Sequence, residues 1–228
     1  MILIKEGKTK DIYAVENGNI LFKFKDSATG DNGVFNPGAN QVGLSIDGMG
    51  AGCLKLSAYL FEKLNEIGIA THYISYEKDK SAMLVRPAVL FGKGLEVICR
   101  FRATGSFVRR YGSVVKEGEK LHALVEMTLK DDENNDPLIT QDTLVMLNIL
   151  SKDEYDKIKT LTQLTAYFLR NLITEKGMEL YDVKLEFGRV DNEVVLIDEI
   201  SAGSMRVYKN GIQVGPLELT DMIIDKED

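Results

Sequence analysis

The order of extended and helical segments is the feature that most constrains the fold of this chain. Short β-rich runs stand at 2–4, 11–15 and 19–24, and turn residues such as ENGN separate them. A glycine-rich loop is expected over 27–43. Further strands are predicted over 69–76, 82–91, 95–103 and 122–130, with a polar turn at 77–81. Strands mixed with helices, without regular βαβ alternation, predict an α+β fold.

Two amphipathic helices are predicted. Apolar residues at helical spacing ahead of Gly68 mark the first helix, and they are Cys53, Leu56, Leu60, Leu64 and Ile67. The second helix spans about 151–176, where Ser151 and Glu154 form a capping box and Gly177 ends the helix. Its apolar face is expected to consist of Ile158, Leu161, Leu164, Phe168 and Leu172. This helix should be core scaffold.

Length and charge limit the class of protein. The 228 residues suffice for one large domain or two lobes, and we expect lobes over 1–90 and 91–228, since Pro87 and two glycines lie in 87–94. The formal net charge of −7 argues against a nucleic-acid-binding surface. Neither a membrane span nor a signal peptide is recognisable. We therefore expect a cytoplasmic protein that acts on small molecules, with Cys53 and Cys99 as buried or inert thiols.

The segment EGKTKDIY, residues 6–13, is a candidate phosphate-binding turn. Gly7 lets the backbone approach a ligand closely, and Lys8 and Lys10, two apart in an extended chain, are expected to project to the same side. A solvated hairpin turn is the alternative, and this stretch alone favours it, because short glycine-lysine motifs are common by chance. The spacing of a Walker A loop is absent.

The segment CRFRATGSFVRR, residues 99–110, is a candidate anion site. Arg100 and Arg102 share one face of a strand, and Gly105 and Ser106 resemble the start of a short helix. Guanidinium groups, a hydroxyl and the N–H groups of a helix start together suit a phosphate monoester or a carboxylate. A surface strand paired with acidic neighbours is an equally good interpretation.

The acidic, amide-rich segment LKDDENNDP, residues 129–137, is a weaker candidate. Such a loop can hold a hydrated cation or groups that contact a substrate, and Asp136 followed by Pro137 fixes a turn. Without other support, an exposed loop is the better interpretation.

The stretch DVKLEFGRVDNEVVLIDEIS, residues 182–201, is a candidate metal site. Strand alternation turns Val183, Leu185 and Phe187 to the core and therefore places three charged residues, Asp182, Lys184 and Glu186, on the other face. Asp198 follows an apolar run, so its carboxylate needs a partner such as Mg²⁺. A three-residue loop over 191–193 would pair Val190 with Val194. That register would set Glu186 opposite Asp198 on one face of a hairpin.

Taken together, these motifs resemble one family. EGKTKDIY, CRFRATGS, LKDDENNDP, DVKLEFG and DEIS followed by an arginine occur in the order and at the separations of the SAICAR synthetases, over residues 6–206. The resemblance implies an ATP-dependent ligase that joins L-aspartate to the carboxylate of carboxyaminoimidazole ribonucleotide (CAIR). It also implies a two-lobed α+β fold related to the ATP-grasp and protein-kinase nucleotide folds. ATP and Mg²⁺ are the implied cofactors, and a homo-oligomer is possible.

The same resemblance implies roles for single residues. Lys8 and Lys10 would contact ATP phosphates, and Glu186 and Asp198 would hold Mg²⁺. The ribonucleotide phosphate would be bound by Arg100, Ser106 and Arg206. The nucleotide and imidazole pocket, where the chemistry takes place, would be lined by Lys130, Asp136, Asp182 and Lys184. By this reading 1–90 is the nucleotide-binding lobe, and 91–228 carries the substrate and metal residues.

The chain departs from the family pattern at two places. Ala202 and Gly203 stand where Pro-Asp is common after the Asp-Glu-x-Ser motif, and Asn135 stands where many relatives have histidine. The first departure removes an expected acidic contact, and the second weakens any claim for acid–base chemistry there.

Two other functions compete with the ligase. A kinase-like phosphotransferase would also use a glycine hairpin, a lysine and metal-binding acids, but H-R-D and D-F-G motifs are absent. A nucleotide-binding regulatory module would not need the arginine cluster. Because activation of a carboxylate by ATP requires no Ser, Cys or His nucleophile, neither His72 nor His122 is assigned a catalytic role.

Overall fold

The computed structural model describes residues 1–31, 33–39, 41–77 and 81–224. The chain forms two compact units: unit 1 contains Met1–Ala88, Glu199–Ser204 and the segment from Val214 on, and unit 2 contains Val89–Asp198 and Met205–Gln213. The chain therefore passes from unit 1 to unit 2 between Ala88 and Val89, within 87–94. Neither unit is one continuous segment, in contrast to the lobes expected over 1–90 and 91–228. The C-terminal segment belongs to unit 1 because helix α5 (Pro216–Ile223) packs on α1 (Met49–Glu66), where Thr220 Oγ1 donates to Gly52 O at 3.4 Å.

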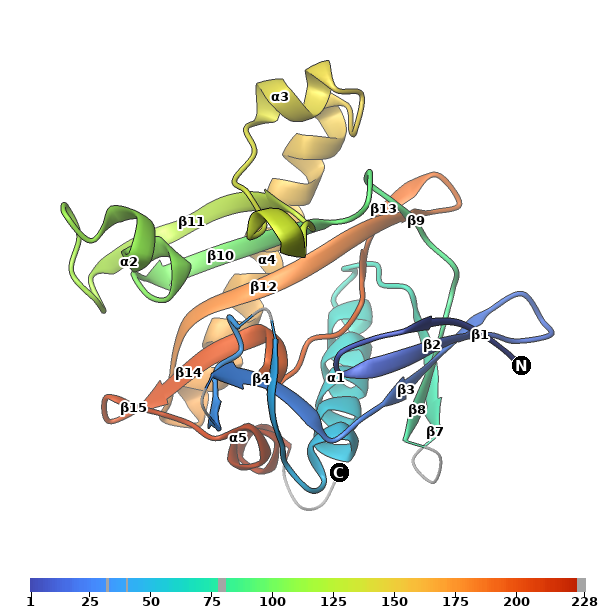
Figure 1. Cartoon of the computed structure of the whole chain (residues 1–228), viewed down its shortest axis with the longest axis horizontal. Coiled ribbons are helices and arrows are strands. Elements are labelled where there is room, and N and C mark those ends of the chain that lie inside the picture. Colours follow the sequence, from blue (N-terminus) through green and yellow to red (C-terminus); the bar gives the residue numbers. More distant parts are fainter. Residues whose placement is uncertain (32, 40, 78–80, 225–228) are drawn as a thin grey trace. The chain divides into compact units, whose positions relative to one another are not determined.

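Unit 1 contains a five-stranded antiparallel sheet in the order β1-β2-β3-β8-β7 (Figure 1). Its strands are β1 (Ile2–Glu6), β2 (Lys10–Ala14), β3 (Ile20–Phe24), β7 (Tyr73–Glu77) and β8 (Ala82–Val85). The expected strands are present, although the run predicted over 82–91 is interrupted ahead of Pro87 and continues only as β9 (Val89–Leu90) in unit 2. The polar turn expected at 77–81 lies partly outside the described residues.

The glycine-rich segment 27–43 is not a loop, so that prediction was wrong. It contributes to a small sheet in the order β5-β4-β6, formed by β4 (Ser27–Asp31), β5 (Val34–Phe35) and β6 (Val42–Ser45). Gly30 allows this pairing, because a Cβ there would lie 2.2 Å from Val34 O. The predicted first helix is confirmed as α1, and Gly68 follows it with a left-handed φ of 83°.

Unit 2 is built on one antiparallel sheet in the order β11-β10-β12-β14-β15, to which β13 and β9 add through β12. Its further strands are β10 (Leu95–Arg102), β11 (Lys120–Leu129), β12 (Glu179–Val190), β13 (Glu193–Ile197), β14 (Met205–Lys209) and β15 (Ile212–Gln213). Figure 1 shows the long strand β12 passing through the middle of this sheet. The strands predicted over 95–103 and 122–130 are confirmed.

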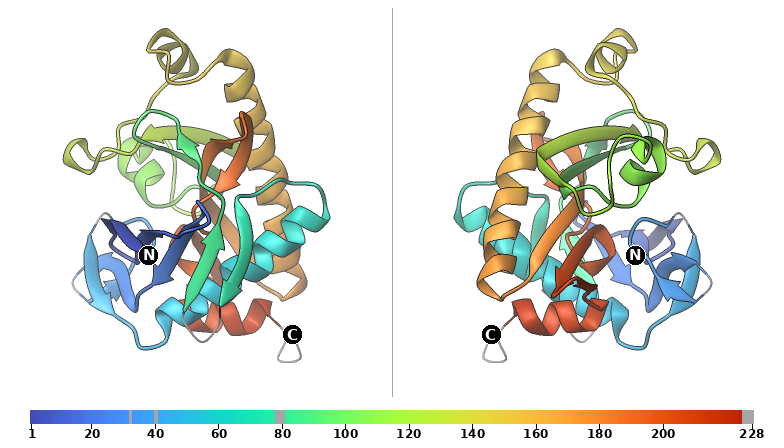
Figure 2. Two further views of the ribbon diagram at one scale, coloured as in Figure 1. Left: turned by 90° about the vertical axis from the view of Figure 1, so that its right-hand side faces the viewer. Right: turned by 90° about the vertical axis from the view of Figure 1, so that its left-hand side faces the viewer.

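The long helix α4 (Lys152–Glu175) lies along one face of this sheet (Figure 2). The capping box is present: Ser151 Oγ accepts from Glu154 N–H at 3.2 Å, and Glu154 Oε2 accepts from Ser151 N–H at 2.8 Å. The buried face is rotated from the predicted one, since Leu164 is 53% exposed. The buried residues are Ile158, Thr162, Thr165, Ala166, Leu169 and Ile173. The spacing identified a helix but not the side that the sheet covers.

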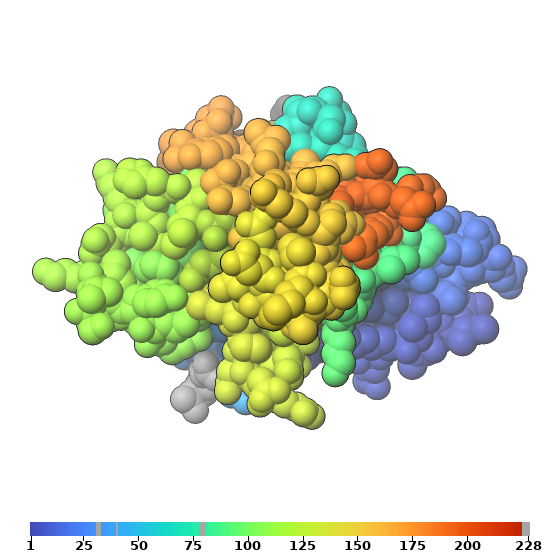
Figure 3. All heavy atoms as spheres, turned by 90° about the horizontal axis from the view of Figure 1, so that it is seen from above, coloured from blue at the N-terminus to red at the C-terminus, as the bar shows by residue number. Residues whose placement is uncertain are grey.

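Three short elements complete unit 2. They are α2 (Ser106–Tyr111), the 3₁₀ turn η2 (Asp132–Asn134) and α3 (Gln141–Met146). The space-filling view in Figure 3 shows α3 and the start of α4, in yellow, at the molecular surface. In unit 1, a further 3₁₀ turn, η3, covers Ala202–Ser204. Among the described residues, no helix is both long and apolar enough to cross a membrane.

Candidate active site

Strand alternation on β12 separates an apolar face from a charged one, as predicted. Val183, Leu185 and Phe187 are at most 1% exposed and share the face on which α4 packs. The opposite face carries Asp182, Lys184 and Glu186. Asp182 and Glu186 are also buried, so this face is covered as well and its charges must be paired.

Three of the predicted residues lie in one row across this charged face. The register sets Asp182 opposite Arg100 on β10 and opposite Arg206 on β14. Asp182 Oδ2 accepts from Arg100 Nη1 at 2.7 Å and from Arg206 Nη1 at 2.8 Å. Burial raises the pKa of the Asp182 carboxyl, and the two guanidinium groups act in the opposite direction. Asp182 thus fixes two cationic groups side by side.

Ser106 completes this cluster at the start of α2. Its Oγ accepts from Arg100 Nη2 at 2.9 Å. Gly105 has a φ of 55°, and a Cβ there would lie 2.7 Å from Arg206 Nη2, so only glycine lets the chain pass so close to that guanidinium. Arg100, Ser106 and Arg206 therefore come together, while Arg102 points elsewhere and pairs with Glu179.

A second cluster on β12 contains Lys184 and Glu186, which lie two and four residues beyond Asp182. Glu186 faces Glu96 in the register with β10, and Lys184 Nζ donates to Glu96 Oε1 at 2.7 Å. Lys130 Nζ lies 2.5 Å from Glu186 Oε1. Burial lowers the pKa of the Lys184 ammonium group, but Glu96 and Glu186 outweigh this effect, so its pKa is raised. The cluster alternates acidic and basic groups, and the two carboxylates favour the charged form of Lys184.

The predicted hairpin register was wrong. Val190 pairs with Glu193 and Glu186 with Ile197, across a two-residue turn in which Asp191 and Asn192 have φ values of 52° and 64°. Asp198 lies beyond the end of β13, however, and its φ of 67° breaks the alternation of side chains. Burial raises the pKa of Glu186, and the negative charge of Asp198 raises it further, while Lys130 and Lys184 lower it. The two carboxylates therefore interact in spite of the register.

The two lysines of the first hairpin differ in their surroundings. Lys8 is exposed and lies in a bend, whereas Lys10 is 8% exposed and begins β2. Lys10 Nζ lies 2.7 Å from Glu199 Oε1, a carboxylate that Ser201 Oγ also contacts at 2.7 Å. Gly7 permits a close approach within the chain, since a Cβ there would lie 2.3 Å from Lys10 O.

The loop that follows β11 is folded tightly. Asp136 has a φ of 48°, and its Oδ1 accepts from Asp131 N–H at 2.8 Å. Asn135 also has a left-handed φ, of 56°, and its side chain is exposed. Lys130, the residue at the start of this loop, is the one that reaches Glu186. Among the described residues, there is no group of three or more His, Cys, Asp or Glu side chains placed to hold a metal ion.

Comparison with known proteins decides the family. A model of the SAICAR synthetase family matches residues 3–227. The phosphoribosylaminoimidazole-succinocarboxamide synthase of Clostridium tetani is 54% identical over 227 residues, which are 99% of this chain and 100% of that protein. The chain belongs to the SAICAR synthetase family.

Solved structures of SAICAR synthetases have the same fold. The phosphoribosylaminoimidazole-succinocarboxamide synthase of Ehrlichia chaffeensis has a TM-score of 0.82 at 30% identity, over 92% of this chain and 87% of that one. A SAICAR synthetase in complex with ADP has a TM-score of 0.81 at 30% identity, over 92% and 86% of the two chains. The expected α+β fold of this family is thereby confirmed.

Membership of the SAICAR synthetase family settles the reaction. The chain is an ATP-dependent carbon–nitrogen ligase that joins L-aspartate to the carboxylate of CAIR and forms SAICAR, ADP and phosphate in purine biosynthesis. The two rival functions, a kinase-like phosphotransferase and a regulatory module without turnover, are excluded.

Sequence reasoning missed three carboxylates that hold predicted cations. Glu199 contacts Lys10, Glu96 contacts Lys184, and Glu126 contacts Arg100. Glu199 could have been found beside Asp198, but its partner is 189 residues away in sequence. The other two depend on which strands are neighbours, and the motifs do not reveal that.

The departure at Ala202 and Gly203 lies in a closely packed turn. Ser201 Oγ accepts from Gly203 N–H at 3.1 Å, and Ala202 is buried as part of η3. Cys53 lies nearby, and burial together with the charge of Glu199 raises the pKa of its thiol to about 12. Burial likewise raises the pKa of Cys99 to about 12. Both thiols are therefore buried and protonated at neutral pH, as expected.

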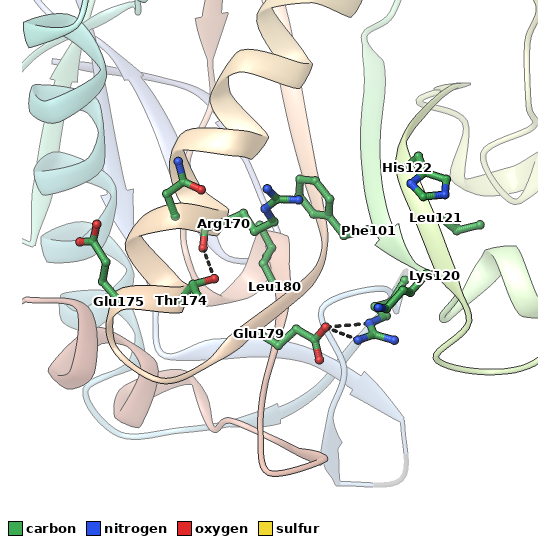
Figure 4. Close-up of a pocket in the computed structure, with 11 residues that line it drawn as sticks. Phe101, Lys120, Leu121, His122, Arg170, Thr174, Glu175, Glu179 and Leu180 are labelled. Carbon is green, nitrogen blue, oxygen red and sulfur yellow. Dashed lines mark hydrogen bonds and ion pairs between the residues drawn. The ribbon is translucent and has the colours of Figure 1, made fainter.

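A hollow of about 600 Å³ lies on the other side of the sheet, between the end of α4 and strands β10 to β12 (Figure 4). Arg170 covers part of its wall, with its guanidinium 4.9 Å from the ring centre of Phe101. His122, one of the two histidines, is exposed at its rim. The predicted site residues do not line this hollow.

Proposed function

We propose that Arg100, Ser106 and Arg206 bind the 5′-phosphate of CAIR. The observation that carries this proposal is that both guanidinium groups contact one buried oxygen of Asp182 while the Ser106 hydroxyl contacts Arg100. Arginine forks and a hydroxyl at a helix start favour a phosphate monoester. Asp182 then acts on the substrate through the arginines that it orients.

Glu186 and Asp198 are the proposed ligands of Mg²⁺. Their carboxylates repel each other, since the charge of Asp198 raises the pKa of Glu186. Oxygen donors of this kind, completed by phosphate oxygens and water, suit Mg²⁺. A bound Mg²⁺ would neutralise charge that develops on the transferring phosphoryl group.

Lys10 is the proposed contact for ATP phosphates, with Lys8 as a second, exposed contact. Lys10 Nζ is held by Glu199 and lies 5.7 and 5.9 Å from the ring centres of Phe22 and Phe24. A lysine confined in this way has lost much of its rotamer freedom before ATP arrives, which lowers the entropic cost of binding.

The remaining charged residues act on the reacting end of CAIR. Its carboxylate resists attack by an amine, so ATP must turn one carboxylate oxygen into a leaving group by phosphoryl transfer, either through an acyl phosphate or in a concerted step, with release of ADP. The amine of L-aspartate then attacks that carbon and loses a proton, and phosphate departs. We propose that Lys130 and Lys184 offset the negative charge of the substrate during these steps. Asp136, which fixes the loop after β11, completes the nucleotide and imidazole pocket in this proposal.

Two wider expectations complete the proposal. The enzyme works in the cytoplasm, and its partners are the small molecules CAIR, L-aspartate and ATP. The resemblance allows a homo-oligomer, but the proposed site does not require one, because every proposed contact is supplied by one chain.

Steady-state kinetics of Arg206→Ala test the proposed phosphate site. The variant is expected to raise KM for CAIR far more than KM for ATP, because only CAIR carries the phosphate that Arg206 would bind. An equal change in both constants would remove Arg206 from the site.

A further inference from the structure

Glu126 on β11 holds two arginines at once. Its Oε2 accepts from Arg100 Nε at 2.7 Å, and its two oxygens accept from Arg110 Nη2 at 2.7 and 2.9 Å. The Glu126 side chain is 9% exposed, so its charge needs such partners. Glu126 faces Ile98 in the register, which places its carboxylate diagonally across from Arg100.

The two arginines connect Glu126 to both ends of α2. Arg110 lies in the last turn of this helix, and Ser106 is its first residue and accepts from Arg100 Nη2. None of the six residues of α2 is buried, and its N-cap makes no side-chain hydrogen bond. A helix this short is not stable alone. Its position therefore depends on tertiary contacts such as these.

Glu126 also limits how Arg100 can be oriented. A guanidinium group has five N–H bonds. Nε donates to Glu126, Nη1 donates to Asp182 at 2.7 Å and makes a long contact of 3.5 Å with Thr104 O, and Nη2 donates to Ser106. These contacts among the described residues leave one Nη2–H for a ligand. The direction of that N–H is set jointly by the Glu126 and Asp182 carboxylates on either side.

We propose that Glu126, together with Arg110, is a positioning residue for recognition of the CAIR phosphate. It fixes the plane of the Arg100 guanidinium and tethers α2, so that the Ser106 hydroxyl and the remaining Arg100 N–H face the same phosphate. This inference rests on the phosphate site proposed above, but it adds two residues that do not themselves contact the substrate.

Kinetics of Glu126→Gln with CAIR and with its dephosphorylated ribonucleoside test this role. The amide has the same size, but it replaces two charged oxygens by one neutral oxygen, and its NH₂ group meets an arginine N–H, which is another donor. KM for CAIR is expected to rise on the order of tenfold, while KM for ATP and L-aspartate and kcat/KM for the ribonucleoside stay unchanged. An unchanged KM for CAIR, or an equal loss with CAIR and ribonucleoside, would overturn the proposal.

Arg110→Gln provides a milder test if Glu126→Gln does not fold. Arg110 is 29% exposed and is only one of the two arginines that Glu126 holds. We therefore expect a smaller rise in KM for CAIR and no change in KM for ATP or L-aspartate. No rise with a stable Arg110→Gln protein would contradict the tethering of α2. Glu179→Gln is the matched control, because it removes the ion pair with Arg102 in the same sheet and should leave every KM unchanged.

Arg206→Ala separates failure of this inference from failure of the proposed site. If Arg206→Ala does not raise KM for CAIR, the phosphate site itself is wrong. If Arg206→Ala raises it but Glu126→Gln and Arg110→Gln do not, the site stands and the positioning role is wrong.

Discussion

Replacement of Asp182 by asparagine should weaken binding of CAIR while leaving binding of ATP intact. The Asp182 side chain is 4% exposed, and one of its oxygens accepts from both Arg100 and Arg206. Asparagine keeps the shape but offers one neutral oxygen and one NH₂ group. With its oxygen in the place of Asp182 Oδ2, asparagine can still accept from both arginines, but a neutral oxygen holds each of them more weakly than a carboxylate does.

The size of the effect follows from these two contacts. A hydrogen bond to a charged group contributes about 1.5–3 kcal/mol, and a neutral acceptor is worth roughly half as much. Weakening of both contacts by half therefore costs about 2 kcal/mol in total. Since about 1.4 kcal/mol corresponds to a factor of ten, the expected loss in kcat/KM with CAIR is at most roughly 30-fold. Part of this cost will instead lower the free energy of unfolding.

Two measurements separate binding from stability. Steady-state kinetics at saturating ATP and aspartate give kcat/KM for CAIR, and urea unfolding gives the change in stability. A loss confined to CAIR supports the role of Asp182 in orienting the arginines. The reasoning would be refuted by a variant that keeps the wild-type kcat/KM for CAIR, or by one whose kcat/KM falls by the same factor for CAIR and for ATP.

Four further predictions concern other charged residues. Lys10→Ala and Glu199→Gln should both lower the affinity for ATP in a calorimetric titration, because the Glu199 carboxylate holds the Lys10 ammonium group at 2.7 Å. Unchanged ATP affinity in both variants would remove Lys10 from the ATP site. Glu186→Gln or Asp198→Asn should nearly abolish turnover without altering the circular dichroism spectrum, and full activity in either would exclude the metal site. Because the pKa of Glu186 is raised by burial and by Asp198, apparent Mg²⁺ affinity should already fall at a pH above the ordinary glutamate range, and a Mg²⁺ titration at several pH values checks this. The hydrogen bond with Arg189 lowers the pKa of the Glu154 carboxyl from 4.5 to about 2. The charged carboxylate therefore stabilises the fold by about 1–2 kcal/mol at a pH above its unfolded-state pKa, and this stabilisation is lost as the pH falls toward its folded-state pKa. Urea unfolding should show the gap between wild type and Glu154→Gln closing over that pH range, and a constant gap would contradict it.

The parts of the fold that local chemistry determines could be predicted from the sequence. Ser151 and Glu154 form the capping box that their spacing indicates, and Gly68 ends α1 with a left-handed φ. The alternation on β12 was also clear, because Val183 and its apolar neighbours define the buried face without reference to any other strand.

The parts that depend on pairing between distant segments could not be predicted. The prediction of a three-residue loop over 191–193, in place of the Asp191-Asn192 turn, assumes that Asp198 continues the strand, whereas the strand ends at Ile197 and Asp198 has a φ of 67°. Both turn residues tolerate the left-handed region, so the residues themselves permitted either loop. The contact between Glu126 and Arg100 required knowing that β11 and β10 are neighbours. The covered side of α4 likewise depends on the sheet beneath it.

Release of ADP with single components omitted tests the central claim most directly. The protein is mixed with ATP, Mg²⁺, CAIR and L-aspartate, and ADP is measured after each component is left out in turn. The ligase reaction on this site predicts ADP release that depends on both CAIR and L-aspartate, with SAICAR formed in equal amount. Sustained ADP release without CAIR or without L-aspartate, or ADP release without SAICAR, would contradict it.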